Sequence, residues 1–329
     1  MSQKISNTLQ WVYAKMQALL FRMIVRVLPL VLTNQPLVKN LVKTTDVETH
    51  KLLVEYLLKS SPNILEMTKD RFSLRAIADF NRQLQLVMPM DYPKQEILIS
   101  ASTRQELFRR KAVHKEPETV AWLETNMQPG DTLYDIGANV GGYSLIACAI
   151  VQANCTVYAF EPSFTTFATL GRNIMLNNFQ KAIIPFHIAL SSKTALVHFA
   201  YSDLEPGSAF HGINTTQVGK SPHQSNMIQL MLSYRIDDLV TQFGLRKPNL
   251  IKLDVDGHEL QVLQGAQQIL ASPELRSVLV EVDYDQGERR DSILNMLQKY
   301  GFKLGPEYGR KELENLNYRN LIFYRVADR

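Results

Sequence analysis

The chain has 329 residues, of which 45% are hydrophobic and 21% are charged, a composition that fits a globular protein and excludes an intrinsically disordered one. Its two cysteines, Cys148 and Cys155, indicate neither a disulfide framework nor a metal-ligand set, so a reducing, cytoplasmic compartment is expected. The net charge is +4, but residues 1–43 carry six basic and no acidic side chains. The remainder is therefore slightly acidic, and no nucleic-acid partner is expected.

The N-terminal residues predict a basic helical extension. Residues 9–33 are rich in Leu, Met, Val and Phe, but Lys15, Arg22 and Arg26 interrupt them and would lie on one side of a helix. These charges argue against a membrane-spanning segment or a secretory signal. A cationic amphipathic helix fits either peripheral contact with an anionic membrane or packing against neighbouring helices. A second helix is predicted over 46–59, before a Ser-Ser-Pro sequence.

The chain divides into a helical extension (1–60), a connecting segment with short strands (61–112) and an α/β domain (113–329). The α/β domain alternates predicted strands at 131–136, 156–160, 183–190, 250–254 and 278–282 with helices at 143–150, 164–177, 259–270 and 291–300, and ends with strand patterns at 302–304 and 321–326. Residues 195–235 interrupt the alternation with two strands around a polar stretch, as a segment that covers a site does. The pattern predicts a Rossmann-like fold.

The predicted strand at 131–136 ends in a turn that contains Gly137, Gly141 and Gly142. Glycines let the backbone turn tightly and approach a ligand before the next helix begins. Glu161 lies 19 residues after Gly142, where Rossmann-like folds place the acid that accepts hydrogen bonds from ribose hydroxyls. Asn139 occupies the place of the second glycine of a dinucleotide-binding turn, which argues against NAD.

Acidic side chains also lie at the carboxyl ends of the predicted strands 250–254 and 278–282, at Asp254–Glu259 and Glu281–Asp283. Ligands of open α/β sheets bind at the carboxyl ends of the strands, so these acids would line one crevice. Such a lining suits a ligand with a sulfonium, an ammonium and a ribose diol. S-adenosyl-L-methionine is that ligand.

Several motifs together resemble the FkbM family of class I methyltransferases: Asp135-Ile-Gly-Ala-Asn-Val-Gly141, Ala159-Phe-Glu-Pro162, Asn173 with Asn177, Ile236-Asp-Asp238, Ile251-Lys-Leu-Asp-Val-Asp-Gly-His-Glu259 and Gly265-Ala266. The resemblance covers residues 113–305. It implies a seven-stranded Rossmann-like sheet whose last strand is antiparallel. It also implies S-adenosyl-L-methionine as the methyl donor and O-methylation of a hydroxyl on a sugar or a secondary metabolite.

The same resemblance implies roles for individual residues. Asp254 would face the transferred methyl group, and Glu161 would bind the ribose. The methionine end of the cofactor would be held by Asp135 and by the backbone of Gly137, Ala138, Asn139 and Gly141. The chain departs from the family at Asp256, where Glu is most frequent, and at His258, where a small residue is common.

Methyl transfer is an in-line displacement, to which positioning of the reactants contributes most, and a base helps to remove the hydroxyl proton. His258 has the most suitable intrinsic pKa for this step. Asp254 and Glu259 would need raised pKa values or would orient the hydroxyl. A carboxylate that ends an apolar strand is costly to bury without a partner, which favours a functional role for Asp254, although Lys252 could simply pair with it. Glu259 could instead stabilise the start of the next helix.

Other interpretations stay open at this point. Glu161 would serve an NAD-dependent oxidoreductase equally well, and a methyltransferase fold could persist in a non-catalytic, membrane-associated protein. Asp254 and its neighbours could hold a divalent ion, although no spacing demands a metal. Residues that could contact a small hydroxylated acceptor are Glu281, Asp283, Ser208 and His211. The sequence identifies neither the acceptor nor the oligomeric state.

Overall fold

The computed structural model describes residues 86–214, 227–283, 287–305 and 318–326. These residues belong to one compact unit, Leu86–Arg329. The predicted N-terminal extension, with its helices at 9–33 and 46–59, lies outside the described residues. Within the described part of the chain, no helix is long and apolar enough to cross a membrane.

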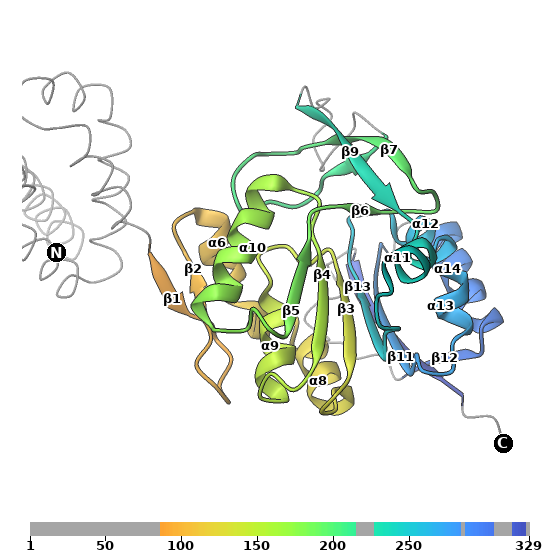
Figure 1. Ribbon diagram of the computed structural model, residues 1–329, viewed down its shortest axis with the longest axis horizontal. Coiled ribbons are helices and arrows are strands. Elements are labelled where there is room, and N and C mark those ends of the chain that lie inside the picture. The colour runs from red at the N-terminus through yellow and green to blue at the C-terminus, as the bar shows by residue number, and fades with distance from the viewer. Residues whose placement is uncertain (1–85, 215–226, 284–286, 306–317, 327–329) are drawn as a thin grey trace, which may run out of the picture. The chain divides into compact units, whose positions relative to one another are not determined.

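A seven-stranded sheet forms the centre of the fold, with the order β12-β13-β11-β10-β3-β4-β5 (Figure 1). Strands β3, β4, β5, β10 and β11 run parallel, whereas β13 is antiparallel to both of its neighbours. The sheet is therefore Rossmann-like with an antiparallel last strand, as predicted. The strands are β3 (Thr132–Ile136), β4 (Thr156–Phe160), β5 (Ile183–Phe186), β10 (Leu250–Leu253), β11 (Ser277–Asp283), β12 (Phe302–Leu304) and β13 (Tyr318–Arg325).

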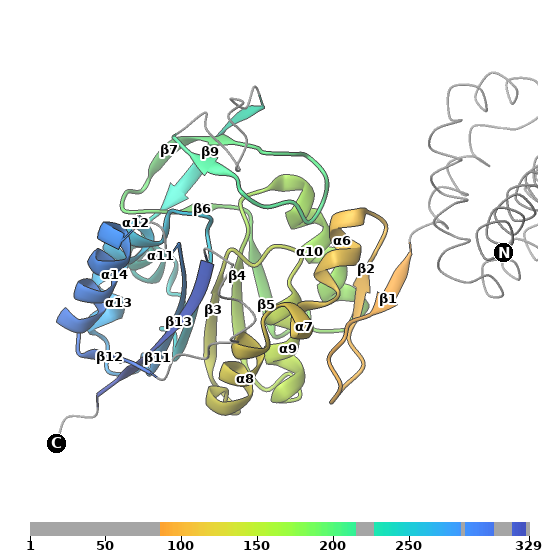
Figure 2. The same ribbon diagram turned by 180° about the vertical axis from the view of Figure 1, so that it is seen from behind.

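Helices cover both faces of this sheet because alternate strand residues point to opposite sides. Leu133 packs into the core under one group of helices, while its neighbour Tyr134 packs into the core on the other side. The first group consists of α8 (Pro117–Asn126), α9 (Gly142–Ile150) and α10 (Phe164–Leu176), which Figure 2 shows from behind. The second group consists of α11 (Ile236–Phe243), α12 (Glu259–Gln264), α13 (Gln267–Ala271) and α14 (Gly287–Lys299).

Two predicted elements are each split in the structure. The strand expected at 183–190 ends at Phe186, which pairs with the last residue of β4, and Ala189–Leu190 forms β6 in another sheet. The helix expected at 259–270 breaks at Gly265 and continues as α13. A Cβ on Gly265 would overlap the main-chain oxygen of Ser191, so the break follows from a tertiary contact that the local pattern does not reveal.

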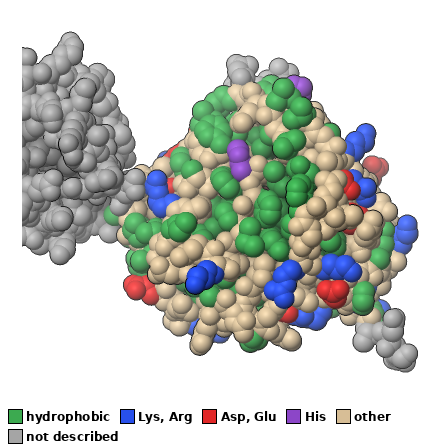
Figure 3. All heavy atoms as spheres, viewed as in Figure 1, with side chains coloured by type: hydrophobic (Ala, Val, Ile, Leu, Met, Phe, Trp, Pro, Cys, Tyr) green, Lys and Arg blue, Asp and Glu red, His purple; other side chains and the backbone are tan. Residues whose placement is uncertain are grey.

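The inserted segment and the short strand before it form the second sheet, with the order β6-β9-β7-β8, which lies beyond the carboxyl ends of the central strands (Figure 1). Its strands are β6 (Ala189–Leu190), β7 (Ala195–Ala200), β8 (Gly212–Ile213) and β9 (Ile228–Tyr234). The two strands predicted in this segment are therefore present. Figure 3 shows hydrophobic side chains gathered where β7 and β9 lie. The outer face of these strands exposes Leu196, Leu230 and Leu232.

Residues 86–116 pack into the same core, whereas the sequence-based division assigned those up to 112 to a connecting segment. They form β1 (Val87–Pro89), β2 (Leu98–Ser100), α6 (Arg104–Arg109) and α7 (Ala112–Lys115). Helix α6 begins with a capping box, in which the side chains of Thr103 and Glu106 each accept the other's backbone N–H. The sequence analysis predicted strands in this segment but not the two helices.

Candidate active site

A cleft of about 760 Å³ lies at the carboxyl ends of β3, β4 and β10. Its lining comes from several parts of the chain: the turns after these three strands, the inserted segment, the α6–α8 region and α14. The cleft is lined by Gly137, Asn139, Glu161, Asp254 and His258 among others. The structure thus brings together six of the predicted catalytic and cofactor residues, with Glu259 as the sixth, and the acceptor candidates Ser208, His211 and Glu281.

The turn after β3 packs directly against the loop after β10. Gly137 has φ +78°, and a Cβ there would overlap the main-chain oxygen of Asp254. Asn139 also has a positive φ, of 50°, a conformation that Asn tolerates better than most residues. Gly141 has φ +90°, with a Cβ position that lies 2.6 Å from Leu170 Cδ1. The turn therefore needs glycines where the sequence has them.

Glu161 is buried beside this turn, with 4% of its surface exposed, and it lines the cleft. One carboxylate oxygen accepts the backbone N–H of Asn139 at 2.9 Å, and the other accepts that of Ser163 at 2.8 Å. Burial raises the pKa of Glu161 to about 7, although both hydrogen bonds act against this shift. The acid is fixed where the sequence analysis expected it.

Asp135 is fully buried beneath the turn and is not among the residues that line the cleft. Its Oδ2 accepts a hydrogen bond of 2.6 Å from Ser144 Oγ in α9. Its Oδ1 lies 3.9 Å from Lys252 Nζ, because the register of β3 and β10 places these two residues side by side. Asp135 therefore links β3 to α9 and to β10 beneath the turn. Its predicted contact with a cofactor stays a prediction.

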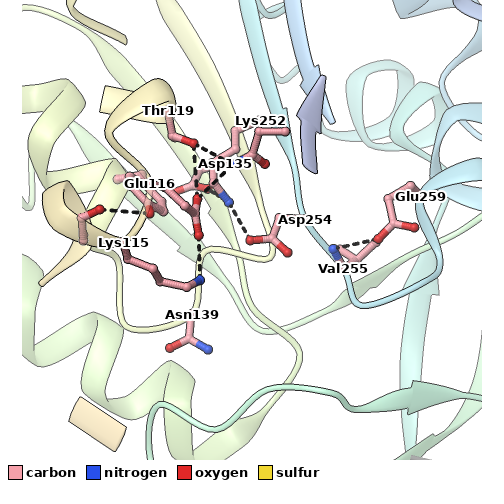
Figure 4. A network of polar contacts seen from close by, with 12 residues as sticks. Lys115, Glu116, Thr119, Asp135, Asn139, Lys252, Asp254, Val255 and Glu259 are labelled. Carbon is pink, nitrogen blue, oxygen red and sulfur yellow. Dashed lines mark hydrogen bonds and ion pairs between the residues drawn. The ribbon is translucent and has the colours of Figure 1, made fainter. Parts of the chain in front are cut away.

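A cluster of charged side chains occupies the centre of the cleft (Figure 4). Oxygens of Glu116, Asp254 and Glu281 lie within 4.8 Å of one another. Lys115 Nζ is 2.6 Å from Glu116 Oε1, and Lys252 Nζ is 3.2 Å from Asp254 Oδ2. Burial would raise the pKa of Asp254, but the two lysines hold it at about 2. Burial and the charge of Asp254 raise the pKa of Glu281 well above its usual range.

The same three carboxyl groups could hold a divalent cation, but the ammonium groups of Lys115 and Lys252 already supply positive charge to them. Sequence reasoning missed the roles of Lys115 and Glu116, because they precede the sheet and follow no strand. The sequence Glu116-Pro-Glu-Thr was informative only about the start of α8, where Pro117 occupies the first turn.

The loop after β10 is organised by Glu259. Its Oε1 accepts the backbone N–H groups of Val255 and Gly257, at 3.2 and 2.9 Å, and its Oε2 accepts Arg289 Nη2 at 3.0 Å. Both oxygens are thus engaged. His258 lines the cleft with Nε2 3.4 Å from Ser191 Oγ, and burial lowers its pKa to about 4, so the imidazole is neutral at pH 7.

The inserted segment closes one side of the cleft and is fastened at several points. Asn139 Nδ2 donates to the carbonyl of Ser208 at 2.9 Å, and Arg109 Nε donates to that of Gly207 at 3.0 Å. The backbone N–H of Phe210 donates to Asp256 Oδ2 at 2.6 Å. We call residues 203–213 the roof. It is tied to α6, to the turn after β3 and to the loop after β10.

A seven-stranded Rossmann-like sheet with an antiparallel last strand, a glycine turn after its central strand and an acid after the next strand define a class I methyltransferase. Residues 135–304, just over half of the chain, match the model of the methyltransferase FkbM domain. The chain belongs to this family of methyltransferases, which confirms the resemblance seen in the sequence.

Two relatives show the extent of the similarity. The chain is 30% identical over 178 residues to the hexuronic acid methyltransferase AglP of Haloferax volcanii, a match that covers 54% of this chain and 66% of that protein, just under two thirds. It is 25% identical over 202 residues to the 31-O-demethyl-FK506 methyltransferase FkbM of Streptomyces tacrolimicus, covering 55% and 76%.

Among solved structures, methyltransferase FkbM from Methylobacillus flagellatus matches with a TM-score of 0.43 and 12% identity, over 66% of this chain and 62% of that chain.

Proposed function

We propose that this methyltransferase transfers the methyl group of S-adenosyl-L-methionine to a hydroxyl oxygen of a small molecule, a sugar or a secondary metabolite. The observation that carries the proposal is the pairing of Glu161 with the turn after β3, where the acid is held by the backbone N–H of Asn139. An ionised Glu161 has lone pairs left for the two ribose hydroxyls. Gly137 lines the cleft, and its missing Cβ lets this turn pack against the backbone of Asp254.

The charges of the cleft also fit this cofactor. Asp254 and Glu116 are ionised, line the cleft and are each paired with one lysine, so the positive groups of this cofactor meet carboxylates there without an excess of positive charge. When bound, the cofactor supplies a methyl group that its sulfonium already activates. The chain then has to orient the acceptor hydroxyl, remove its proton and exclude water.

Asp254 is the residue that we assign to the acceptor hydroxyl. It is ionised, it lines the cleft, and Lys252 fixes its carboxylate from below. In this role Asp254 accepts the hydrogen bond of the hydroxyl and orients its oxygen, because a carboxylate with a lowered pKa is a weak base. Neutral His258, which lies on the side of Ser191, is the group that we assign to accept the hydroxyl proton. Glu259 acts as a positioning residue, because its carboxylate holds the loop that carries both of them.

The activities of the two relatives support the acceptor class. One is a hexuronic acid methyltransferase, and the other is a 31-O-demethyl-FK506 methyltransferase. The roof contributes Phe210 and Ile213 to the lining of the cleft, and β11 and β13 contribute Glu281 and Asn320. An acceptor with an apolar face and several hydroxyls fits these walls.

Calorimetry with S-adenosylhomocysteine and with NADH tests the cofactor. We expect binding of the first and not of the second. Methyl transfer is then followed with a labelled cofactor over a panel of uronic acids, neutral sugars and hydroxylated macrocycles, with Asp254→Asn as the inactive control and with and without a chelator. Binding of NADH alone would favour an oxidoreductase, and loss of transfer with chelator would require a metal.

A further inference from the structure

The cations that line the cleft differ in how they are paired. Lys115 contacts Glu116 at 2.6 Å, and Arg289 contacts Glu259 at 3.0 Å. Arg109 instead uses only its Nε, which donates to the carbonyl of Gly207. Within residues 86–214, 227–283, 287–305 and 318–326, its two terminal nitrogens have no hydrogen-bond or ion-pair partner. The Nε of Arg109 is thus anchored, and its Nη1 and Nη2 can donate to a ligand.

Arg109 is held in place by the element that carries it. It is the last residue of α6, and α6 is fixed by buried Glu106, whose Oε1 accepts Thr169 Oγ1 from α10 at 2.9 Å. The anchor to Gly207 limits the side chain further. Such a side chain loses little conformational entropy when it binds a ligand, so it is suited to recognition.

Arg109 also lies among the groups expected to surround the cofactor. Burial raises the pKa of Glu161 and of Asp256, and in both cases the positive charge of Arg109 acts in the opposite direction. The same charge acts on Lys115 and on His211 in the roof. The guanidinium lines the same cleft, and its charge acts on Glu161, on the loop after β10 and on the central charge cluster.

The methionine end of S-adenosyl-L-methionine carries a carboxylate as well as an ammonium. The lysines of the central cluster are already paired, Lys115 with Glu116 and Lys252 with Asp254, so the carboxylate needs a cation whose donors are not engaged. A planar guanidinium fork matches a carboxylate better than a lysine does. We infer that Arg109 binds the carboxylate of the methionine end. This inference rests on the proposed function, since it requires this cofactor.

The test uses two ligands and three forms of the full chain. S-adenosylhomocysteine carries the carboxylate, and its decarboxylated analogue, S-adenosyl-3-thiopropylamine, lacks only that group. Wild type, Arg109→Met and Arg110→Met are compared by calorimetry. Arg110 is the matched control because it follows α6 directly, donates to the carbonyl of Pro89 and does not line the cleft. The methionine side chain keeps the apolar stem and removes the fork.

We expect wild type and Arg110→Met to bind S-adenosylhomocysteine about 10- to 100-fold more tightly than the analogue, which is the range for a charge-assisted hydrogen bond. Arg109→Met should bind the two ligands with equal affinity. If Arg109→Met still prefers S-adenosylhomocysteine by the wild-type factor, the inference is wrong while the proposed function stands. If Arg109→Met loses the same factor of affinity for both ligands, Arg109 affects binding only indirectly, by holding the roof in place. Failure of wild type to bind S-adenosylhomocysteine would overturn the proposed function itself.

Discussion

Gly137 packs so closely on Asp254 that a Cβ on the glycine would overlap the main-chain oxygen of the aspartate. The contact joins the turn after β3 to the loop after β10. Because the first segment is proposed to hold the cofactor and the second the acceptor hydroxyl, one backbone contact sets the spacing between the two reacting groups.

Gly137→Ala should therefore abolish S-adenosylhomocysteine binding and destabilise the fold. Gly130→Ala is the matched control, since Gly130 also has a positive φ, of 88°, but nothing lies within 4 Å of its Cβ position. The control should lose about 1 kcal/mol, the cost of the left-handed conformation alone, and Gly137→Ala clearly more. Urea unfolding and calorimetry measure both effects. Equal losses in the two variants would show that the close approach is unimportant.

A second prediction concerns the roof. Asp256→Ala removes the acceptor of the Phe210 N–H, whereas Asp256→Asn keeps an oxygen there. We expect the amide of Phe210 to exchange with solvent at least several-fold faster in the alanine variant, since one hydrogen bond contributes about 1 kcal/mol. The asparagine variant should stay close to wild type. Hydrogen exchange followed by mass spectrometry resolves this segment, and identical exchange in both variants would exclude a fastening role for Asp256.

The strands and the acids that follow them could be predicted because a buried strand appears in the sequence as a run of consecutive apolar residues. Strand β4 has the predicted bounds, and Glu161 lies directly after it. The break at Gly265 could not be predicted, because it depends on Ser191, which is remote in sequence. The same holds for Arg109 and Lys115. They reach the cleft through the packing of α6 and α7 on the sheet, and no local pattern records that packing.

Glu161 predicts how stability depends on pH. Its pKa is about 7 in the folded protein against an ordinary 4.5, so the folded state binds the proton more tightly. The free energy of unfolding should therefore fall as pH rises from about 4.5 to 7, by an amount on the order of 3 kcal/mol, and then level off. Glu161→Gln should lose this part of the dependence. Melting temperatures of both proteins between pH 5 and 8, without ligand, check the sign.

The basic N-terminus carries a prediction that concerns residues outside those described. If residues 9–33 form the cationic amphipathic helix indicated by their sequence, the full chain should sediment with vesicles that contain anionic lipid. A chain that lacks residues 1–33 should stay in the supernatant, and high salt should release the full chain. Neutral vesicles serve as the control. Equal sedimentation of both chains would refute peripheral membrane contact through this segment.

The last prediction separates the roles of the two carboxyl groups at the centre of the cleft. Glu281 and Asp254 lie together, but Lys252 contacts Asp254, and the pKa of Glu281 is raised well above its usual range, so a proton on this pair favours Glu281. Asp254→Asn removes the ionised group that orients the hydroxyl and should lower kcat about 100-fold or more, the usual scale for a misplaced reactant. Glu281→Gln keeps a hydrogen-bond donor where the neutral acid has one, so it should retain activity within about tenfold of wild type.

Glu281→Leu removes that donor and should lower kcat well below the Gln variant, with S-adenosylhomocysteine binding unchanged in all three. Because the pKa of Asp254 is about 2 and that of His258 about 4, neither group changes its charge between pH 6 and 8. The dependence of kcat on pH over this range should therefore be shallow. If Glu281→Gln is as inactive as Asp254→Asn, Glu281 must be ionised during turnover, and the assignment of the proton within this pair is reversed.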